Sequence, residues 1–143
     1  MITRQIFIRF PHPKSILYMN VKIDTKEKFV VIAPTEPHFT AIMTEELRDM
    51  LTPYLQKDIP HIVLNLSAVT SMDDQSCGIL TDLQNFFYQN DCSFVICELQ
   101  PALEAQMDRL GVLEILNVTP TESEAWDIVQ MEEIERELLR EDD

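Results

Sequence analysis

Apolar residues in the middle of the chain recur in short runs that are typical of β-strands. Residues 21–24 and 29–33 flank a polar stretch and predict a β-hairpin. Residues 62–66 and 94–97 are mostly apolar, as expected of strands that are covered on both faces in a parallel sheet. A last short strand is expected at 115–118, so the pattern predicts five strands.

Between these strands, apolar residues return at helical spacing and predict four helices. The first helix is expected to weaken at Pro53. Pro101 suits the first turn of the third helix, and Gly111 suits the left-handed residue that closes it. Thr121 and Glu124 form a capping box that opens the fourth. The apolar positions are Met43, Leu47, Met50, Leu51 and Tyr54; Ile79, Leu83, Phe86 and Phe87; Leu103, Met107 and Leu110; and Ala125, Ile128 and Met131.

The order of these elements predicts an α/β fold. Strands that are separated by single helices connect through right-handed crossovers, which makes the sheet mostly parallel. The opening hairpin is the antiparallel exception. We therefore expect one domain with a mixed, mostly parallel sheet of about five strands and about four helices.

Composition excludes several classes of function. The 143 residues suffice for one ordinary domain, and 11 basic against 25 acidic residues give a net charge of −14. Such a charge repels phosphate backbones and anionic lipid, so we expect neither nucleic acid nor a membrane surface as partner. Two glycines cannot build a P-loop or a dinucleotide-binding fingerprint. No apolar run approaches the length of a membrane span, so no membrane insertion is expected.

Neither the cysteines nor the histidines form a recognisable local site. The cysteine count is odd and no pair has CxxC spacing, so neither a disulfide framework nor a zinc site is expected. The cysteines are more simply interpreted as small apolar residues of a protein in a reducing cytosol. The histidines are interpreted as surface residues, and no metal or cofactor is expected. The residues concerned are Cys77, Cys92 and Cys97, and His12, His38 and His61.

The most concentrated polar segment is 69–78, which joins the predicted strand at 62–66 to the second helix. Functional surfaces of α/β proteins gather at this edge, where parallel strands end and helices begin. Asp73 and Asp74 are adjacent here. As residues that precede a helix, they are expected to accept hydrogen bonds from its first N–H groups. As a metal or acid–base pair they lack a third ligand at a useful spacing.

Five stretches, in the same order, resemble the STAS domain family, which is named for sulfate transporters and anti-sigma factor antagonists. Residues 62–67, Ile-Val-Leu-Asn-Leu-Ser, resemble the family's strand apolar-apolar-Leu-Asp-Leu-Ser. Residues 69–78 resemble its loop Val-x-x-(Ile/Met)-Asp-Ser-Ser-Gly-Leu-Gly. The match covers roughly 19–130. The other stretches are Leu-Gln-Pro-Ala-Leu at 99–103, Leu-Gly-Val at 110–112 with Ile-Leu at 115–116, and Thr-Glu-Ser-Glu-Ala at 121–125.

The resemblance also suggests where the domain begins. Residues 19–23, Met-Asn-Val-Lys-Ile, resemble a common start of the family, so residues 1–18 would be an N-terminal extension, or would come from an upstream start that the native gene does not use. Ile6, Ile8 and Phe10 recur there at every second position, which suits an added edge strand.

At the other end, residues 131–143 continue the last helix beyond the STAS-like domain at 19–130. This C-terminal helical extension is acidic, with seven Asp and Glu residues and two arginines. Its Ile134, Leu138 and Leu139 would stay bare unless they dock on the domain or on another chain. A homodimer through the terminal extensions would provide such cover.

The resemblance implies four helices that pack mainly on one face of the sheet. It further implies a protein that is not an enzyme and that binds a partner, often an anti-sigma factor that is also a serine kinase. In the family, this kinase phosphorylates the first serine of the Asp-Ser-Ser-Gly loop, and the phosphate releases the partner.

This sequence departs from the family at the phosphorylated position. Asp73 takes the family's Asp position, Asp74 the phosphorylated serine, Gln75 the second serine and Ser76 the glycine. Asn65 replaces the usual aspartate at the end of the strand. An aspartate cannot accept a phosphate ester from a serine kinase and carries about one negative charge, where phosphoserine carries about 1.5 to 2. We expect the switch to be absent, or fixed in a partly phosphorylated-like state.

We therefore expect a cytoplasmic regulator of the anti-sigma factor antagonist kind, which docks an anti-sigma kinase or another STAS regulator. The alternative is a soluble STAS subunit of a membrane ABC transport complex of the lipid-exporting type, which would use the same surface. An enzyme that uses Asp73 and Asp74 is the third hypothesis. The residues expected on the docking surface are Ser71, Asp73, Asp74, Gln75, Ser76 and Cys77.

Overall fold

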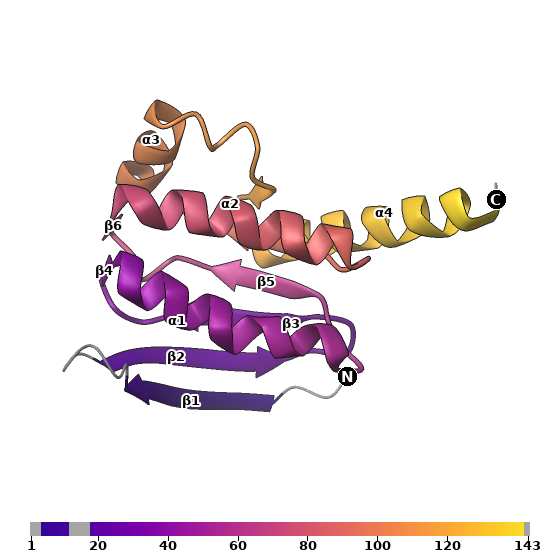
Figure 1. Cartoon of the computed structure of the whole chain (residues 1–143), viewed down its shortest axis with the longest axis horizontal. Helices are drawn as coiled ribbons and strands as arrows, with labels where there is room; N and C mark the ends of the chain where they lie inside the picture. Colours follow the sequence, from indigo (N-terminus) through magenta and orange to yellow (C-terminus); the bar gives the residue numbers. More distant parts are fainter. Residues whose placement is uncertain (1–3, 12–17, 142–143) are drawn as a thin grey trace.

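A mixed β-sheet forms the centre of the molecule. The computed structural model describes residues 4–11 and 18–141, and within these ranges the sheet has six strands (Figure 1). The pairings of β1 with β2 and of β2 with β3 are antiparallel, and the other three are parallel. In spatial order the strands are β1 (Arg4–Pro11), β2 (Tyr18–Thr25), β3 (Val30–Pro34), β5 (Ile62–Asn65), β7 (Phe94–Cys97) and β8 (Val118–Thr119).

The predicted α/β class and the antiparallel opening hairpin are confirmed. The last strand is shorter than predicted at 115–118, because the residues before Val118 turn instead of extending. Both Ile115 N and Leu116 N donate to the carbonyl of Val112, over 3.0 and 2.9 Å. A strand that the five-strand estimate did not count, β1, lies at the outer edge and pairs Ile6 with Ile23.

Four α-helices accompany the sheet within the described ranges, and their ends follow the predicted signals. α1 gives way to the 3-10 turn η1, which holds Pro53 near its start. Gly111, at φ +75°, closes α3. The Thr121 hydroxyl accepts a hydrogen bond from Glu124 N at 3.2 Å, as the capping box predicts. No helix in the described ranges is both long and apolar enough to cross a bilayer. The bounds are α1 (Ala41–Leu51), η1 (Thr52–Gln56), α2 (Asp74–Gln89), α3 (Pro101–Arg109) and α4 (Glu122–Glu141).

The helices cover both faces of the sheet unequally. Alternate strand residues point to opposite faces, so each strand contributes to two cores. Ile32, Leu64 and Ile96 belong to the larger core, which holds the buried residues of α1, α2 and α3. Val63 and Val95 belong to the smaller core under α4. The helices thus pack mainly on one face, as expected, and among the described helices only α4 packs on the other.

His61 is buried, which corrects its interpretation as a surface residue. His61 is 8% exposed, and its Nε2 lies 2.6 Å from a carboxylate oxygen of Glu133 on α4. Its Nδ1 accepts a hydrogen bond from Ser93 N at 3.1 Å. Burial lowers the pKa of His61, and the Glu133 carboxylate offsets this only in part. Of the other histidines, His38 is exposed, and His12 lies outside the described residues.

A second, two-stranded sheet prepares the candidate site. β4 (His38–Phe39) and β6 (Ser71–Met72) pair in parallel, with His38 opposite Ser71 and Phe39 opposite Met72. Phe39 and Met72 are buried, whereas His38 and Ser71 are exposed. The pairing therefore brings the segments that precede α1 and α2 side by side, at one end of the molecule (Figure 1).

Candidate functional site

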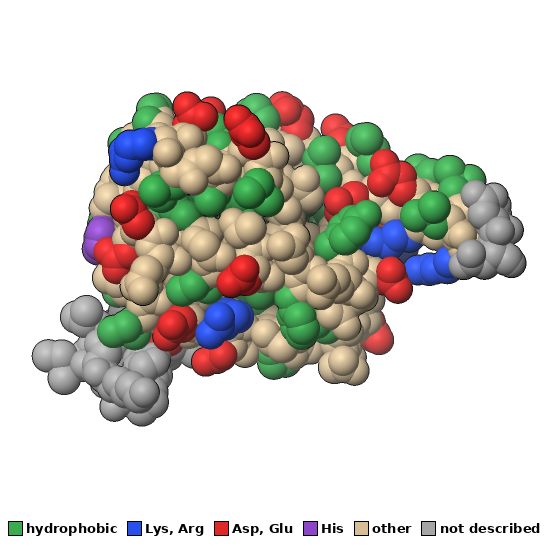
Figure 2. All heavy atoms as spheres, turned by 45° about the horizontal axis from the view of Figure 1, so that its top comes forward, with side chains coloured by type: hydrophobic (Ala, Val, Ile, Leu, Met, Phe, Trp, Pro, Cys, Tyr) green, Lys and Arg blue, Asp and Glu red, His purple; other side chains and the backbone are tan. Residues whose placement is uncertain are grey.

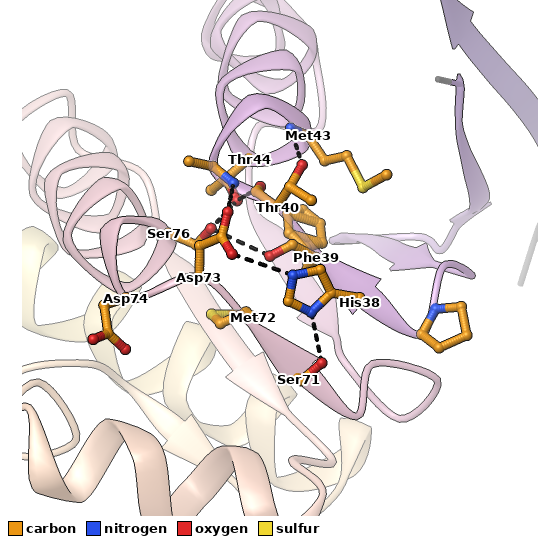
Figure 3. A network of polar contacts seen from close by, with 12 residues as sticks. His38, Phe39, Thr40, Met43, Thr44, Ser71, Met72, Asp73, Asp74 and Ser76 are labelled. Carbon is orange, nitrogen blue, oxygen red and sulfur yellow. Dashed lines mark hydrogen bonds and ion pairs between the residues drawn. The ribbon is translucent and has the colours of Figure 1, made fainter. Parts of the chain in front are cut away.

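Asp73 connects the beginnings of two helices. Its backbone, at φ −68° and ψ 146°, forms the N-cap of α2, but its side chain makes no capping hydrogen bond there. The carboxylate turns instead to α1, where Oδ2 accepts a hydrogen bond from Ala41 N at 2.8 Å (Figure 3). Of the two aspartates expected to accept hydrogen bonds from the first N–H groups of α2, Asp73 therefore does not do so through its side chain. The β4–β6 pairing explains the difference, because it places the free N–H of another helix within reach.

Asp74 faces the opposite direction and is exposed. Its Oδ1 accepts a hydrogen bond from Gln106 Nε2 of α3 at 2.8 Å, and Arg109 lies 4.0 Å away. Gln106 also donates to the carbonyl of Met72 at 2.7 Å, which joins α3 to the loop. The Asp74 side chain is 67% exposed and stands in the first turn of α2, where the helix dipole favours a negative charge. Asp73 and Asp74 therefore diverge and do not form a pair (Figure 3).

Ser76 and Cys77 do not reach the surface, which corrects their place in the predicted docking site. Ser76 is 0% exposed, and its hydroxyl lies 2.7 Å from the Thr44 hydroxyl and 3.4 Å from the carbonyl of Phe39. Cys77 is 1% exposed. Burial raises the pKa of its thiol, and the negative charge of the Asp74 carboxylate raises this pKa further. Of the six predicted residues, Ser71, Asp74 and Gln75 are exposed and Asp73 is half-buried.

His38 belongs to this site, although its sequence context predicts only a surface residue. Its Nδ1 lies 2.6 Å from Ser71 Oγ, and its Nε2 lies 3.2 Å from Asp73 Oδ1 (Figure 3). His38 and Ser71 are 33 positions apart, so no local motif could have signalled the contact. Only the β4–β6 pairing, formed by two residues on each side, brings them together.

Ser71, His38 and Asp73 are of the residue types found in a hydrolytic triad. Their solvent exposure and the neighbouring backbone differ from those of a catalytic triad. The His38 and Asp73 side chains are 52% and 44% exposed, so water screens their interaction. The backbone N–H groups of Ser71 and Asp73 are bonded to the carbonyls of Pro37 and Phe39. They are therefore not free to stabilise an oxyanion near the Ser71 hydroxyl. This geometry suits a surface that is held in shape by polar contacts.

Asn65 lies at the end of β5, where the resemblance to the STAS family implies an aspartate. Its Nδ2 donates to Glu98 Oε2 at 2.7 Å and to Glu122 Oε2 at 2.8 Å, and its Oδ1 accepts from Ser67 N at 2.9 Å. Burial raises the pKa of the neighbouring Cys97 thiol to about 12, and both glutamates add to the rise. An amide fits here because it donates to two carboxylates that an aspartate would repel.

Comparison with solved structures places the fold among known proteins. An anti-sigma factor antagonist from Mycobacterium paratuberculosis has a TM-score of 0.66 at 16% identity, over 85% of this chain and 99% of that chain. The unphosphorylated form of SpoIIAA, an anti-sigma factor antagonist of Bacillus, has a TM-score of 0.61 at 18% identity, over 77% and 96%. The murine anion transporter Slc26a9 has a TM-score of 0.60 at 15% identity, over 73% of this chain and 18% of the transporter. At these identities the similarity shows a shared fold.

The sequence itself matches a family profile over most of the chain. The profile of the STAS domain covers residues 20–125, from the third residue of β2 to the first turn of α4. The match includes both segments of the β4–β6 pair and the strand end at Asn65. The order of strands and helices described above agrees with it. This chain therefore belongs to the STAS domain family.

Proposed function

We propose that this chain is a non-enzymatic cytoplasmic regulator of the anti-sigma factor antagonist kind. It docks an anti-sigma kinase or another STAS regulator through the surface formed by Ser71, Asp73, Asp74 and Gln75. The observation that carries this proposal is the exposed carboxylate of Asp74 in the first turn of α2. It stands where the family resemblance places the phosphorylated serine, so part of the negative charge that a kinase would add is already present.

The surroundings of Asp74 support a fixed state. Gln106 and Arg109 of α3 hold its carboxylate in place without covering it. The serine that is nearest in sequence, Ser76, is buried between α1 and α2 and offers no accessible hydroxyl to a kinase. Similarity in fold to SpoIIAA and to the mycobacterial antagonist supports the same kind of function.

The test compares Asp74→Ser with the wild-type chain. Partners are first captured from native cytosol, and the purified partner is then titrated calorimetrically against both proteins. Two effects compete in the mutant: loss of the charge–dipole attraction costs about 0.3–1 kcal/mol of stability, whereas a switch of this kind couples by about 1–3 kcal/mol. If the carboxylate holds the switch off, the mutant binds more tightly.

Other results of this titration have defined meanings. Weaker binding by Asp74→Ser means that the partner has adapted to the fixed carboxylate. Equal affinities mean that the interface lies elsewhere, which contradicts the proposal. Asp82→Ser is the matched control, because Asp82 is an exposed aspartate further along α2 and should leave affinity unchanged.

The fold's occurrence in a transporter supports the alternative of a STAS subunit in a membrane ABC transport complex. The same capture experiment separates the two. Recovery of an anti-sigma factor favours the regulator, and recovery of an ATPase with its permease favours the transport subunit. A homodimer through the terminal segments stays a prediction; β1, at the outer edge of the sheet, offers main-chain groups for such pairing.

A further inference from the structure

The second half of α4 carries an apolar stripe on its solvent side. Met131, Ile134 and Leu138 are 55%, 57% and 57% exposed. Their spacing of three and four residues places them on one face of the helix. This half of α4 projects from the end of the molecule opposite to β4 and β6 (Figure 1). Hydrophobic, acidic and basic side chains are all visible on the projecting part (Figure 2).

The opposite face of the same helix is anchored, so the stripe cannot turn inward. Arg136 is 9% exposed, and its guanidinium donates to Ser93 Oγ at 3.1 Å and lies 3.6 Å from Glu132. Its guanidinium carbon also lies 5.7 Å from the centre of the Tyr88 ring. Together with the His61–Glu133 contact, these interactions fix the rotation of α4 about its axis.

Charge indicates what this stripe can bind. Asp127 and Glu135 each lie four residues from Met131, and Glu137 lies three residues from Ile134, so the carboxylates neighbour the stripe. All three are exposed. Neither arginine of this helix borders the stripe. Arg136 lies on the anchored face. Arg140 is not at a spacing of three or four residues from Met131, Ile134 or Leu138.

A partner for this face must therefore be both apolar and basic. A second copy would bring its own acidic border against this one, and anionic lipid would be repelled in the same way. A helix that presents leucine-like side chains between lysines or arginines would match both the stripe and its border.

We propose that the α4 outer face, defined by Met131, Ile134 and Leu138, docks a cationic amphipathic helix of another protein. This interaction does not depend on the proposed function, because the face and the Asp74 surface lie at opposite ends of the molecule (Figure 1). The two surfaces can be occupied at the same time. Failure of one proposal leaves the other standing.

The test uses the full chain and two synthetic helical peptides of about 18 residues, or five turns. Both carry leucines at heptad a and d positions; one has lysines at the flanking positions, and its twin has glutamates. Binding is followed by fluorescence anisotropy. We expect the lysine peptide to bind and its glutamate twin not to bind. The affinity should fall when the ionic strength is raised from about 0.05 to about 0.5 M.

Three variants locate the binding site. Ile134→Asp with Leu138→Asp should weaken lysine-peptide binding at least about tenfold, because it removes the central apolar contacts. Glu135→Lys with Glu137→Lys leaves the apolar stripe intact and should weaken binding by a similar factor. Ile115→Asp is the control, because Ile115 is 54% exposed but lies outside α4. Thermal unfolding followed by circular dichroism verifies that each variant folds.

Several results would overturn the proposal. Equal binding by the wild-type chain and both α4 variants would place the peptide elsewhere, and equal binding of the two peptides would remove the charge argument. If sedimentation shows self-association that Ile134→Asp with Leu138→Asp abolishes, the occupant is a second copy. Binding to phosphatidylglycerol vesicles in the absence of peptide binding would identify a membrane surface instead.

Discussion

The carboxylate of Asp73 accepts a hydrogen bond from the backbone N–H of Ala41, 2.8 Å away, although Asp73 itself begins a different helix. The N-terminal ends of α1 and α2 therefore depend on one residue: its backbone forms the N-cap of α2, and its side chain accepts a hydrogen bond from α1. The positive ends of two helix dipoles favour a negative charge at this position. His38 adds a second contact to the same carboxylate, at 3.2 Å.

This relationship predicts different effects for two adjacent aspartates. Asp73→Ala removes the acceptor of an α1 N–H group and should lower the free energy of unfolding by about 1–2 kcal/mol. Asp74→Ala removes an exposed carboxylate from the first turn of α2 and should cost less, about 0.3–1 kcal/mol. Urea unfolding of both variants beside the wild type measures the difference. Equal losses would mean that the Asp73–Ala41 contact has no special weight.

The burial of Ser76 predicts that this residue is not a kinase substrate. After incubation with a related serine kinase, mass spectrometry of the folded protein should find no phosphate on Ser76. Ser76→Asp, which buries a charge between α1 and α2, should destabilise the fold by several kcal/mol, whereas Ser76→Ala should cost about 1 kcal/mol. Phosphate on Ser76 at high occupancy would show that the α1–α2 contact opens readily.

Asn65→Asp tests the amide between two glutamates. The substitution replaces two donated hydrogen bonds with repulsion among three carboxylates and should cost about 3 kcal/mol or more. Adding Glu98→Gln returns a donor to the cluster and should restore part of the loss. Chemical unfolding of the single and double mutants measures both values. A fully stable single mutant would show that water or a rearranged loop compensates.

The buried His61 predicts that stability falls in mild acid. Burial lowers the pKa of His61 in the folded chain below its ordinary value of 6.5. Below pH 6.5 the unfolded chain therefore takes up a proton more readily than the folded chain does. The free energy of unfolding should thus decrease as the pH falls from 6.5 toward the lower folded pKa. Glu133, Glu132 and Arg136, all on α4, are the charged groups around the ring.

The contribution of His61 can be isolated by substitution. His61→Asn keeps a donor and an acceptor but cannot titrate, so unfolding midpoints measured from pH 5 to pH 8 should vary less than those of the wild type. His38→Asn, which replaces an exposed histidine, is the matched control. If both substitutions leave the profile unchanged, another group causes the acid sensitivity.

The parts of the fold that were predictable from sequence depend on repeated local signals. Strands of four or more apolar residues such as Phe94–Cys97, and caps such as the Thr121–Glu124 box, are formed by neighbours in the chain. The β4–β6 pair has two residues in each strand and no period that could reveal it. The position of α4 on the second face of the sheet also depends on tertiary contacts. Its buried Ala125 and Val129 are small and apolar, and such residues would suit packing on either face of the sheet.

The candidate site shows the same division. The acidic loop at the start of α2 was visible as a polar segment after an apolar strand, and the family resemblance pointed to Asp74. The role of His38 and the direction of the Asp73 side chain were not visible, since both depend on residues more than 30 positions away. The burial of Ser76 and Cys77 cannot be predicted from sequence, because packing of α2 against α1 determines which face of α2 is buried.

The hydrogen bond between Ala41 and the Asp73 carboxylate makes occupancy of the loop observable at α1. A cationic group that draws this carboxylate away must release Ala41 N–H, and the first turn of α1 then loses its external acceptor. Amide hydrogen exchange at Ala41 should accelerate when such a ligand binds, although α1 itself is not touched. The first turn of α1 thus serves as a built-in reporter of events on the neighbouring loop.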